Sequence, residues 1–268
     1  MHVDQDKYKT IIVFGALGLI GRHVSKYLAE NACNLVITDL DKNGCTKFSS
    51  ELSKYEVPIL CKSCDITSER SLRELLEATK KRFGNVDSVI NCSTYSSQDT
   101  LSVSARFEDY KLSEWQKMLS VNLDGPFLLS KVFGTSMAES GLGGSIILLS
   151  SIYGFLGTDQ SIYDSVNTLK KRHNNPASYS ASKGGVISLA KYLAAYWGKE
   201  NIRVNVLSLG GIYNNQDEKF VKNYSKRVPM KRMGDLEELN GAIKFLLIDD
   251  SSYFTGQNLI VDGGLSVW

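Results

Sequence analysis

The sequence predicts an α/β protein with a doubly wound, mostly parallel sheet of seven strands and helices on both faces. Short apolar runs of strand length alternate with amphipathic segments of helix length along the whole chain. This alternation is typical of parallel sheets whose strands are joined by helices. The first apolar run leads directly into a glycine-rich turn, and no linker-like stretch divides the 268 residues. We therefore expect a single domain over residues 1–268.

The expected elements follow in order. The strands are residues 10–14, 34–38, 57–61, 87–91, 145–150, 203–208 and 257–261. Between them we expect helices to begin near Leu17, Asn43, Ser68, Ser113, Ala177 and Asp235, several with a Ser, Asn or Asp cap nearby. Two connections, near residues 93–112 and 155–177, are longer than this fold requires. Both follow strands at the sheet edge where ligands bind, so their position favours a functional role.

Composition excludes several kinds of partner. The chain has 31 Lys and Arg against 29 Asp and Glu, so no overall field favours nucleic acid or an anionic membrane. The longest apolar stretch, residues 11–21, is far too short to span a bilayer, and its glycines and acidic lead argue against a signal peptide. We expect a cytoplasmic protein with a small-molecule substrate, no nucleic-acid partner and no membrane contact.

The five cysteines, an odd number without secretory context, indicate reduced thiols. Cys61 and Cys64 have the spacing of a zinc or redox pair, but no second such pair and no nearby histidine completes four ligands. Free cysteine is among the most buried residue types, so we interpret the pair as structural. We expect no metal site.

A strand, a glycine turn and a helix form the expected nucleotide end. In TIIVFGALGLIGRHVSKYLAE, Gly15, Gly18 and Gly21 recur at every third position between the first strand and the helix. Glycine permits a tight turn and lets the backbone approach a pyrophosphate, whose charge meets free N–H groups at the helix N-terminus. This context indicates a Rossmann-type dinucleotide site.

Asp39 ends the second strand, 18 residues after Gly21, about where a carboxylate would meet the adenosine ribose hydroxyls. That carboxylate would repel a 2′-phosphate, so the sequence favours NAD(H). Lys42 nearby could offset the charge, which leaves NADP(H) as an alternative. Asp39 could instead be a capping or turn residue in TDLDKNG.

Tyr179 and Lys183 are four residues apart on an expected helix, so both side chains project from one face. A cation close to a phenol lowers its pKa, and a tyrosine tuned in this way can deliver or accept a proton. On its own this spacing is a common accident of helix surfaces. It gains weight from the motifs that accompany it.

Eight motifs occur in a specific order over nearly the whole length. They are the glycine turn, CDIT (64–67), NCST (91–94), SVNLDGPF (120–127), SIILLSSIYG (145–154), YSASK (179–183), RVNVLSLGGI (203–212) and FTGQNLIVDGG (254–264). With them the sequence resembles the short-chain dehydrogenase/reductase family. The resemblance implies an NAD(P)-dependent oxidoreductase with a catalytic tetrad of Asn122, Ser151, Tyr179 and Lys183.

The resemblance also implies roles for the tetrad. Tyr179 would exchange the proton on oxygen while hydride moves between the nicotinamide and a carbinol or carbonyl carbon. Ser151 would hydrogen-bond the same oxygen as charge develops. Lys183 would bind the nicotinamide ribose and hold down the pKa of Tyr179, and Asn122 would brace a water that links Lys183 to solvent.

Cofactor contacts follow from the same resemblance. Asp65 and Ile66 would line the adenine pocket, Asn91 would lie on its strand beside the cofactor, and Ile212 would approach the nicotinamide. The full implied set is Gly15, Gly18, Leu19, Ile20, Gly21, Asp39, Asp65, Ile66, Asn91, Tyr179, Lys183, Gly210 and Ile212.

Three positions depart from the family pattern. The glycine spacing resembles that of longer sugar-nucleotide epimerases and dehydratases, which need an extra C-terminal substrate domain, whereas this chain ends at Trp268. The usual NNAG reads NCST at residues 91–94, which would alter packing of the cofactor loop. The usual Pro-Gly reads Leu209-Gly210, so that loop loses a φ restraint.

Ser151 and Tyr179 are 28 positions apart, about twice the separation in most relatives, so residues 155–177 include an insertion that we expect to shape the substrate site. Donors and cations suit hydroxyl-rich or phosphorylated ligands. The insertion carries Asp159, Tyr163, Asp164, Lys170, Lys171, Arg172 and His173, and the other long loop adds Arg106 and Lys111. A solvated charged loop or an oligomer contact is the alternative.

The runs around the insertion resemble a branch of the family that is encoded with surface-polysaccharide and flagellin-glycan genes, of the flagellin modification protein A type. This resemblance implies an amino-sugar phosphate substrate in nonulosonic acid-type glycan biosynthesis. A 3-oxoacyl-thioester reductase and a non-enzymatic nucleotide-binding regulator remain as alternatives. The helices in 114–133 and 177–198 are apolar on more than one face, as helices buried between subunits would be, and the resemblance implies a homodimer or homotetramer through them.

Overall fold

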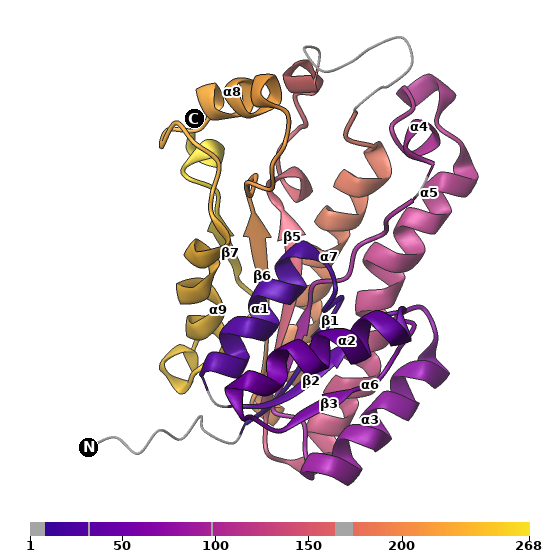
Figure 1. Cartoon of the computed structure of the whole chain (residues 1–268), viewed down its shortest axis with the longest axis vertical. Coiled ribbons are helices and arrows are strands. Elements are labelled where there is room, and N and C mark those ends of the chain that lie inside the picture. The colour runs from indigo at the N-terminus through magenta and orange to yellow at the C-terminus, as the bar shows by residue number, and fades with distance from the viewer. Residues whose placement is uncertain (1–8, 32, 98, 164–173) are drawn as a thin grey trace.

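A computed structural model describes residues 9–31, 33–97, 99–163 and 174–268. It confirms the predicted architecture, a seven-stranded sheet flanked by helices (Figure 1). The strand order is β3-β2-β1-β4-β5-β6-β7, and every neighbouring pair is parallel. The strands are β1 (Thr10–Phe14), β2 (Asn34–Thr38), β3 (Ile59–Cys61), β4 (Ser88–Asn91), β5 (Gly144–Ser151), β6 (Ile202–Leu209) and β7 (Asn258–Val261). The strand order reverses between β1 and β4, where doubly wound sheets bind ligands.

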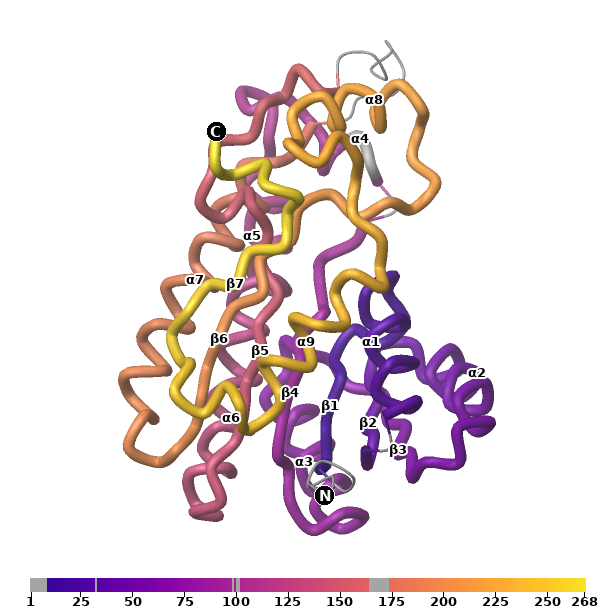
Figure 2. Tube along the Cα trace, turned by 90° about the vertical axis from the view of Figure 1, so that its left-hand side faces the viewer, coloured from indigo at the N-terminus to yellow at the C-terminus, as the bar shows by residue number. Residues whose placement is uncertain are grey.

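Helices form a layer on each face of the sheet. Phe133 of α6 and Val186 of α7 belong to one buried cluster, and Val24 of α1 and Leu246 of α9 belong to the other. In Figure 2, α7 lies on one side of the strands and α1 and α2 lie on the other. The helices are α1 (Leu19–Glu30), α2 (Lys42–Leu52), α3 (Glu69–Phe83), α4 (Thr100–Val103), α5 (Leu112–Leu119), α6 (Gly125–Ser140), α7 (Ala177–Trp197), α8 (Glu218–Arg227) and α9 (Asn240–Leu247).

Some predicted boundaries were wrong. The first helix begins at Leu19 rather than Leu17, because residues 15–18 form the turn before it. Asp235 starts a 3₁₀ helix through a capping box, and α9 follows only at Asn240. The helices α4 and α8 were not predicted; α4 lies in the 93–112 connection, and α8 lies between β6 and Asp235.

The carboxyl edge of the sheet carries the longest connections. In Figure 1, α8 and α4 stand on opposite sides above the ends of β5 and β6. The first long connection contains α4 and a 3₁₀ helix at Phe107–Asp109, and the insertion contains another at Gln160–Tyr163. Within the described part of the chain, no helix combines the length and apolar character needed to cross a bilayer.

Candidate active site

The glycine turn brings backbone close to backbone. Gly15 has a φ of +67°, and a Cβ there would lie 2.7 Å from the backbone nitrogen of Ser93. A Cβ on Gly21 would collide with the carbonyl oxygen of Gly15. The first turn of α1, which starts at Leu19, has neither an acidic residue nor a side-chain cap. Its N–H groups and the positive end of its dipole therefore suit a pyrophosphate.

A cleft of about 420 Å³ lies beside this turn at the carboxyl ends of β1, β2 and β4. Five of the predicted cofactor residues line it, namely Gly15, Gly18, Asp39, Asp65 and Ile66. The cleft thus brings together the predicted pyrophosphate, ribose and adenine contacts from separate segments of the chain.

Asp39 is fixed at the rim of the cleft by two backbone groups. Its Oδ2 accepts a hydrogen bond from the N–H of Leu17 at 3.1 Å, and its Oδ1 accepts one from the N–H of Leu40 at 2.8 Å. The helix cap is a different residue, since Asp41 accepts from the N–H of Gly44 and caps α2. Asp39 therefore ties the end of β2 to the glycine turn while facing the cleft.

Asn91 does not line the cleft but stabilises the turn beside it. The residue is 3% exposed, and its Oδ1 accepts a hydrogen bond from the N–H of Ser93 at 3.1 Å. This bond fixes the turn after β4 against which Gly15 packs. Leu19 and Gly21 are likewise absent from the cleft lining and act through the turn and the start of α1.

A second cavity of about 180 Å³ adjoins the cleft, and Cys92 and Thr94 line both. It gathers six of the predicted residues, namely Ile20, Ser151, Tyr179, Lys183, Gly210 and Ile212. Three members of the predicted tetrad therefore share one cavity with Ile212, which was expected to approach the nicotinamide. The sequence motif NCST supplies the wall between the two cavities.

Tyr179 and Lys183 lie on one face of α7, as their spacing predicted. Lys183 Nζ is 5.5 Å from the centre of the Tyr179 ring and donates a hydrogen bond to the carbonyl of Leu149 at 3.1 Å. Ser151, at the end of β5, hydrogen-bonds Tyr179. The ammonium is therefore directed at the backbone of β5, and the phenol is held by Ser151.

Burial has opposite effects on the two groups. It raises the pKa of Tyr179, and the hydrogen bond with Ser151 opposes that rise. The expected lowering of the phenol pKa by Lys183 stays a prediction. Burial also lowers the pKa of Lys183, to about 8, since its charged form is desolvated.

Asn122 lies in a π-helical turn, Ser120–Asp124, between α5 and α6. Turns of this kind are frequent at functional sites. The side chain is 1% exposed, and its Oδ1 accepts a hydrogen bond from the N–H of Tyr95 at 2.7 Å. Asn122 is therefore tied to the segment after β4, next to Thr94, which lines both cavities.

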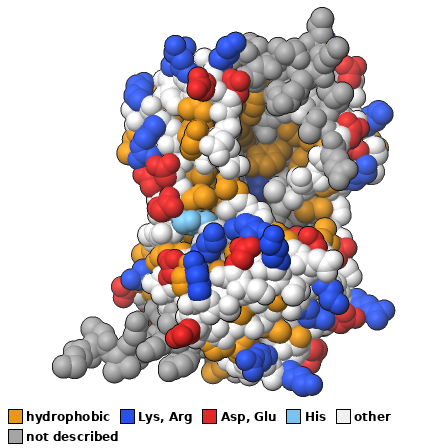
Figure 3. All heavy atoms as spheres, viewed as in Figure 1, with side chains coloured by type: hydrophobic (Ala, Val, Ile, Leu, Met, Phe, Trp, Pro, Cys, Tyr) orange, Lys and Arg blue, Asp and Glu red, His pale blue; other side chains and the backbone are white. Residues whose placement is uncertain are grey.

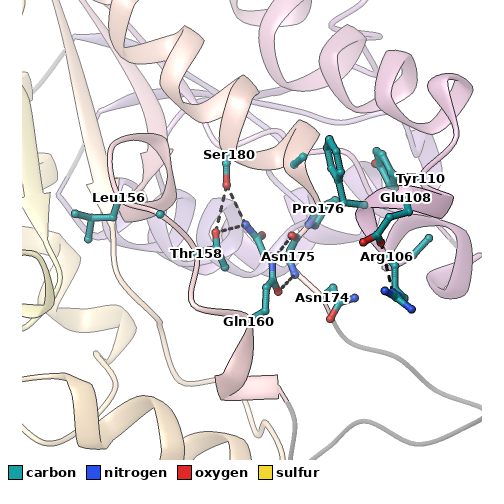
Figure 4. Close-up of a pocket in the computed structure, with 14 residues that line it drawn as sticks. Arg106, Glu108, Tyr110, Leu156, Thr158, Gln160, Asn174, Asn175, Pro176 and Ser180 are labelled. Atoms are coloured by element: carbon teal, nitrogen blue, oxygen red, sulfur yellow. Dashed lines mark hydrogen bonds and ion pairs between the residues drawn. The ribbon is translucent and has the colours of Figure 1, made fainter.

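A larger cavity, of about 1030 Å³, lies between the 93–112 connection and the base of the insertion (Figure 4). Its wall includes Ser180, which directly follows Tyr179, and Leu156, which follows the Ser151 strand end. Polar side chains dominate the labelled residues, namely Arg106, Glu108, Tyr110, Thr158, Gln160, Asn174, Asn175 and Ser180. In the space-filling view this face is hollowed between α8 and α5 (Figure 3).

Asn175 organises one wall of this cavity. Its Nδ2 donates to Thr158 Oγ1 at 2.9 Å and to Ser180 Oγ at 3.1 Å. Gln160 closes the base of the insertion, because its Nε2 donates to the carbonyl of Asn175 at 2.8 Å and its Oε1 accepts from the Asn175 N–H at 3.0 Å. Predicted insertion residues outside the described part of the chain are Asp164, Lys170, Lys171, Arg172 and His173.

The described charges near the cavity are paired. Arg106 and Glu108 approach to 3.4 Å, and Asp159 of the insertion forms an ion pair with Arg227 of α8. Tyr163 packs against Phe220 of α8 with ring centres 5.4 Å apart. The insertion is therefore attached to α8 by an ion pair and by ring packing.

The fold, the glycine turn and the paired cavities define a dinucleotide-binding oxidoreductase of the doubly wound class. A family model described as enoyl-(acyl carrier protein) reductase matches residues 15–266. Post-translational flagellin modification protein A of Campylobacter coli is 32% identical over 96% of this chain and 97% of its own. The NADH-dependent L-xylulose reductase of Ambrosiozyma monospora is 30% identical over 96% of this chain and 94% of its own.

Solved structures agree with these relatives. A gluconate 5-dehydrogenase from Burkholderia cenocepacia, in complex with NADP and tartrate, superposes with a TM-score of 0.84 at 25% identity and covers 97% of this chain and 96% of that one. The chain belongs to the short-chain dehydrogenase/reductase family, whose members are NAD(P)-dependent oxidoreductases. These similar proteins include users of both nucleotides and show no preference.

Some residues of the cavities were not predicted. Cys92 and Thr94 line both cavities, and the departure of NCST from the family pattern was the signal that could have placed them there. Tyr224 of α8 contacts the loop after β6 through its hydroxyl group. Nothing in the sequence marked Tyr224, because α8 itself was not predicted.

Proposed function

We propose that this protein interconverts a carbinol and a carbonyl group on a sugar or amino-sugar derivative, with NAD(H) as the favoured cofactor, in glycan biosynthesis of the nonulosonic acid type. The observation that carries the proposal is that Tyr179 lines the cavity of Ser151 and Lys183, called here the tetrad cavity, while its chain neighbour Ser180 lines the larger cavity, which carries several polar side chains. Its amides and hydroxyl groups suit the many hydroxyls of a sugar.

The proposed chemistry divides between cofactor and protein. A bound nicotinamide dinucleotide would supply or accept the hydride. Tyr179, whose pKa is raised by burial, would be protonated at neutral pH and able to donate its proton to the substrate oxygen in the reducing direction. Ser151, already bonded to Tyr179, would stabilise the charge that develops on that oxygen.

Lys183 and Asn122 would have supporting roles in the same site. The Lys183 ammonium lies in the cavity of Tyr179 and could turn from the Leu149 carbonyl to the hydroxyls of the nicotinamide ribose. Asn122 would hold the segment that bears Thr94. We propose these as the two supporting roles of the tetrad.

Asp39 supports the choice of NAD(H). Its carboxylate is held at the rim of the nucleotide cleft by the N–H groups of Leu17 and Leu40. A fixed negative charge there would accept hydrogen bonds from ribose hydroxyls and repel a 2′-phosphate. NADP(H) remains the alternative cofactor, with Lys42 as the nearby residue that could offset this charge.

Names of relatives support the substrate class. One relative is an L-xylulose reductase, another is a flagellin modification protein, and a similar structure is a gluconate 5-dehydrogenase. The described wall of the large cavity carries Arg106 in a pair with Glu108, so hydrogen bonding to hydroxyls is better supported there than capture of a phosphate. A phosphate would have to be held by residues 170–172 of the insertion.

We further propose a cytoplasmic homo-oligomer. Tyr192 and Tyr196 of α7 are 64% and 60% exposed and stack with ring centres 6.0 Å apart, and Phe127 of α6 is 51% exposed. Large apolar side chains of this kind on two neighbouring helices favour association between copies of the chain.

The test is turnover across substrate classes. Reduced nicotinamide absorbance is followed while the protein is offered amino-sugar phosphates, nucleotide sugars, free sugars and polyols, and 3-oxoacyl thioesters, with NAD(H) and NADP(H) in both directions. Turnover of a sugar derivative with NAD(H) preferred is the expected result. Preferred reduction of a thioester would overturn the substrate proposal in favour of an acyl reductase, and cofactor binding without any turnover would favour a regulator.

A further inference from the structure

Tyr224 of α8 forms a close contact with the loop that follows β6. Its Oη accepts a hydrogen bond from the N–H of Gly211 at 2.5 Å. The side chain is 4% exposed, and a Cβ on Gly211 would lie 2.7 Å from Tyr224 Cζ, so the ring fits only against a glycine. None of the roles described above uses this tyrosine.

The loop that contains Gly211 forms part of the wall of the tetrad cavity. Gly210 and Ile212, on either side of Gly211, line the cavity that holds Tyr179 and Lys183. Position 209, the last residue of β6, is leucine, so the loop begins directly after the paired strand without a proline ring.

Neighbouring backbone bonds fix the loop at both ends and at the carbonyl of Gly211, which accepts from the N–H of Gly234 at 2.9 Å, so that only the N–H of Gly211 depends on Tyr224. The N–H of Gly210 donates to the carbonyl of Val261 at 2.9 Å, and the N–H of Tyr213 donates to the carbonyl of Gly234 at 2.8 Å. Behind the loop lies a cavity of about 100 Å³, which Gly211 and Tyr224 line. The loop thus has room to move backwards, and without the phenol the Gly211 N–H would lose its partner.

Tyr224 is itself held from the substrate side. Its ring lies 6.1 Å from that of Phe220, which packs against Tyr163 of the insertion. The ion pair between Arg227 and Asp159 joins the same two segments. A continuous set of contacts therefore runs from the insertion through α8 to the wall of the tetrad cavity.

We propose that Tyr224 is a positioning residue that holds the Gly210–Ile212 wall forward against the nicotinamide end of a bound cofactor, and that it links this wall to the insertion. The wall's meeting with the nicotinamide rests on the proposed function, whereas the restraint on Gly211 does not.

The first experiment measures the restraint without any ligand. Tyr224→Phe keeps the ring and removes the hydroxyl group, and Tyr253→Phe, at a fully exposed position, is the matched control. Hydrogen exchange of the peptide that contains Gly211 should accelerate in Tyr224→Phe and stay unchanged in Tyr253→Phe. Unchanged exchange in Tyr224→Phe would overturn the proposed restraint.

The second experiment separates the nicotinamide end from the rest of the cofactor. Tyr224→Phe should weaken NADH binding about fivefold, the effect of about one lost hydrogen bond, and leave the affinity for ADP-ribose, which lacks the nicotinamide, unchanged. Equal loss for both ligands would show a general structural role and overturn the positioning role. Faster exchange at Gly211 with unchanged NADH affinity would support the restraint on Gly211 and contradict the proposed contact of this wall with the nicotinamide.

Discussion

Lys183 Nζ lies 5.5 Å from the centre of the Tyr179 ring and directs its hydrogen bond, 3.1 Å long, to the carbonyl of Leu149. The two residues share a cavity, yet the ammonium of Lys183 bonds to the backbone of β5 and the phenol of Tyr179 bonds to Ser151. The consequence is a protonated tyrosine and a lysine whose pKa is lowered. Both states can be measured.

The first prediction concerns the charge of Lys183. In protein labelled with ¹³C at lysine Cε, its signal should titrate near pH 8 in the absence of cofactor, well below the usual lysine range, because burial disfavours the ammonium. Lys183→Met identifies the signal by its loss. Titration of Lys183 together with the surface lysines would contradict the burial of its charge.

The lowered pKa of Lys183 also makes the stability of the fold depend on pH. Because the pKa is lower in the folded state, the contribution of Lys183 is fully present above its ordinary pKa and is lost as the pH falls to about 8. The melting temperature of the wild type without cofactor should therefore rise relative to that of Lys183→Met as the pH is raised from about 8 toward the ordinary lysine pKa. Parallel pH profiles of the two proteins would contradict this prediction.

The second prediction concerns cofactor choice. Asp39→Asn keeps an oxygen that can accept from the N–H of Leu17 or Leu40 and removes the charge. The ratio of kcat/KM with NADP(H) to that with NAD(H) should rise about tenfold or more, since the repulsion of the 2′-phosphate is lost. Asp41→Asn, in the α2 cap, is the control. An unchanged ratio would show that Asp39 does not select the cofactor.

The third prediction concerns the base of the insertion. Gln160→Ala removes both hydrogen bonds with the backbone of Asn175, so the polar wall of the large cavity loses its closure. The KM for substrate should rise severalfold while NADH affinity stays constant, since each such bond contributes about 1 kcal/mol. Gln116→Ala, on the exposed side of α5, serves as control. A constant substrate KM would show that the large cavity does not bind the substrate.

The fourth prediction concerns assembly. Replacing both Tyr192 and Tyr196 with glutamate puts charge where two exposed rings stack on α7. Analytical ultracentrifugation should show dissociation of the wild-type oligomer into smaller species. Tyr253→Glu, at a fully exposed position away from this pair, should keep the wild-type state. A monomeric wild type would contradict the predicted homo-oligomer.

Much of the site could be predicted because its residues sit in short motifs at the ends of strands. The alternation of strands and helices determines that these ends meet at one edge, which is how Ser151 and Gly210 come to share a cavity, and Tyr179 joins them from helix α7. The Gly15 turn carries its own conformational requirement and is visible in sequence for that reason.

The remainder depends on contacts that the sequence does not encode locally. The segment of α8 is highly charged, and its buried face is defined by Tyr163 and Val228 rather than by the sheet. Helical spacing gives the proximity of Tyr179 to Lys183 but neither the burial that raises the pKa of Tyr179 nor the direction of the ammonium. The cations at 170–172 stay a sequence prediction.

Replacement of one hydroxyl group tests the central claim most directly. Tyr179→Phe removes the proposed proton donor and leaves the glycine turn and Asp39 in place, so NADH binding by fluorescence should be retained. Turnover of the best substrate should fall about 10²- to 10⁴-fold, the usual contribution of a positioned proton transfer. Retained turnover in Tyr179→Phe would contradict the assignment of this cavity as the catalytic site.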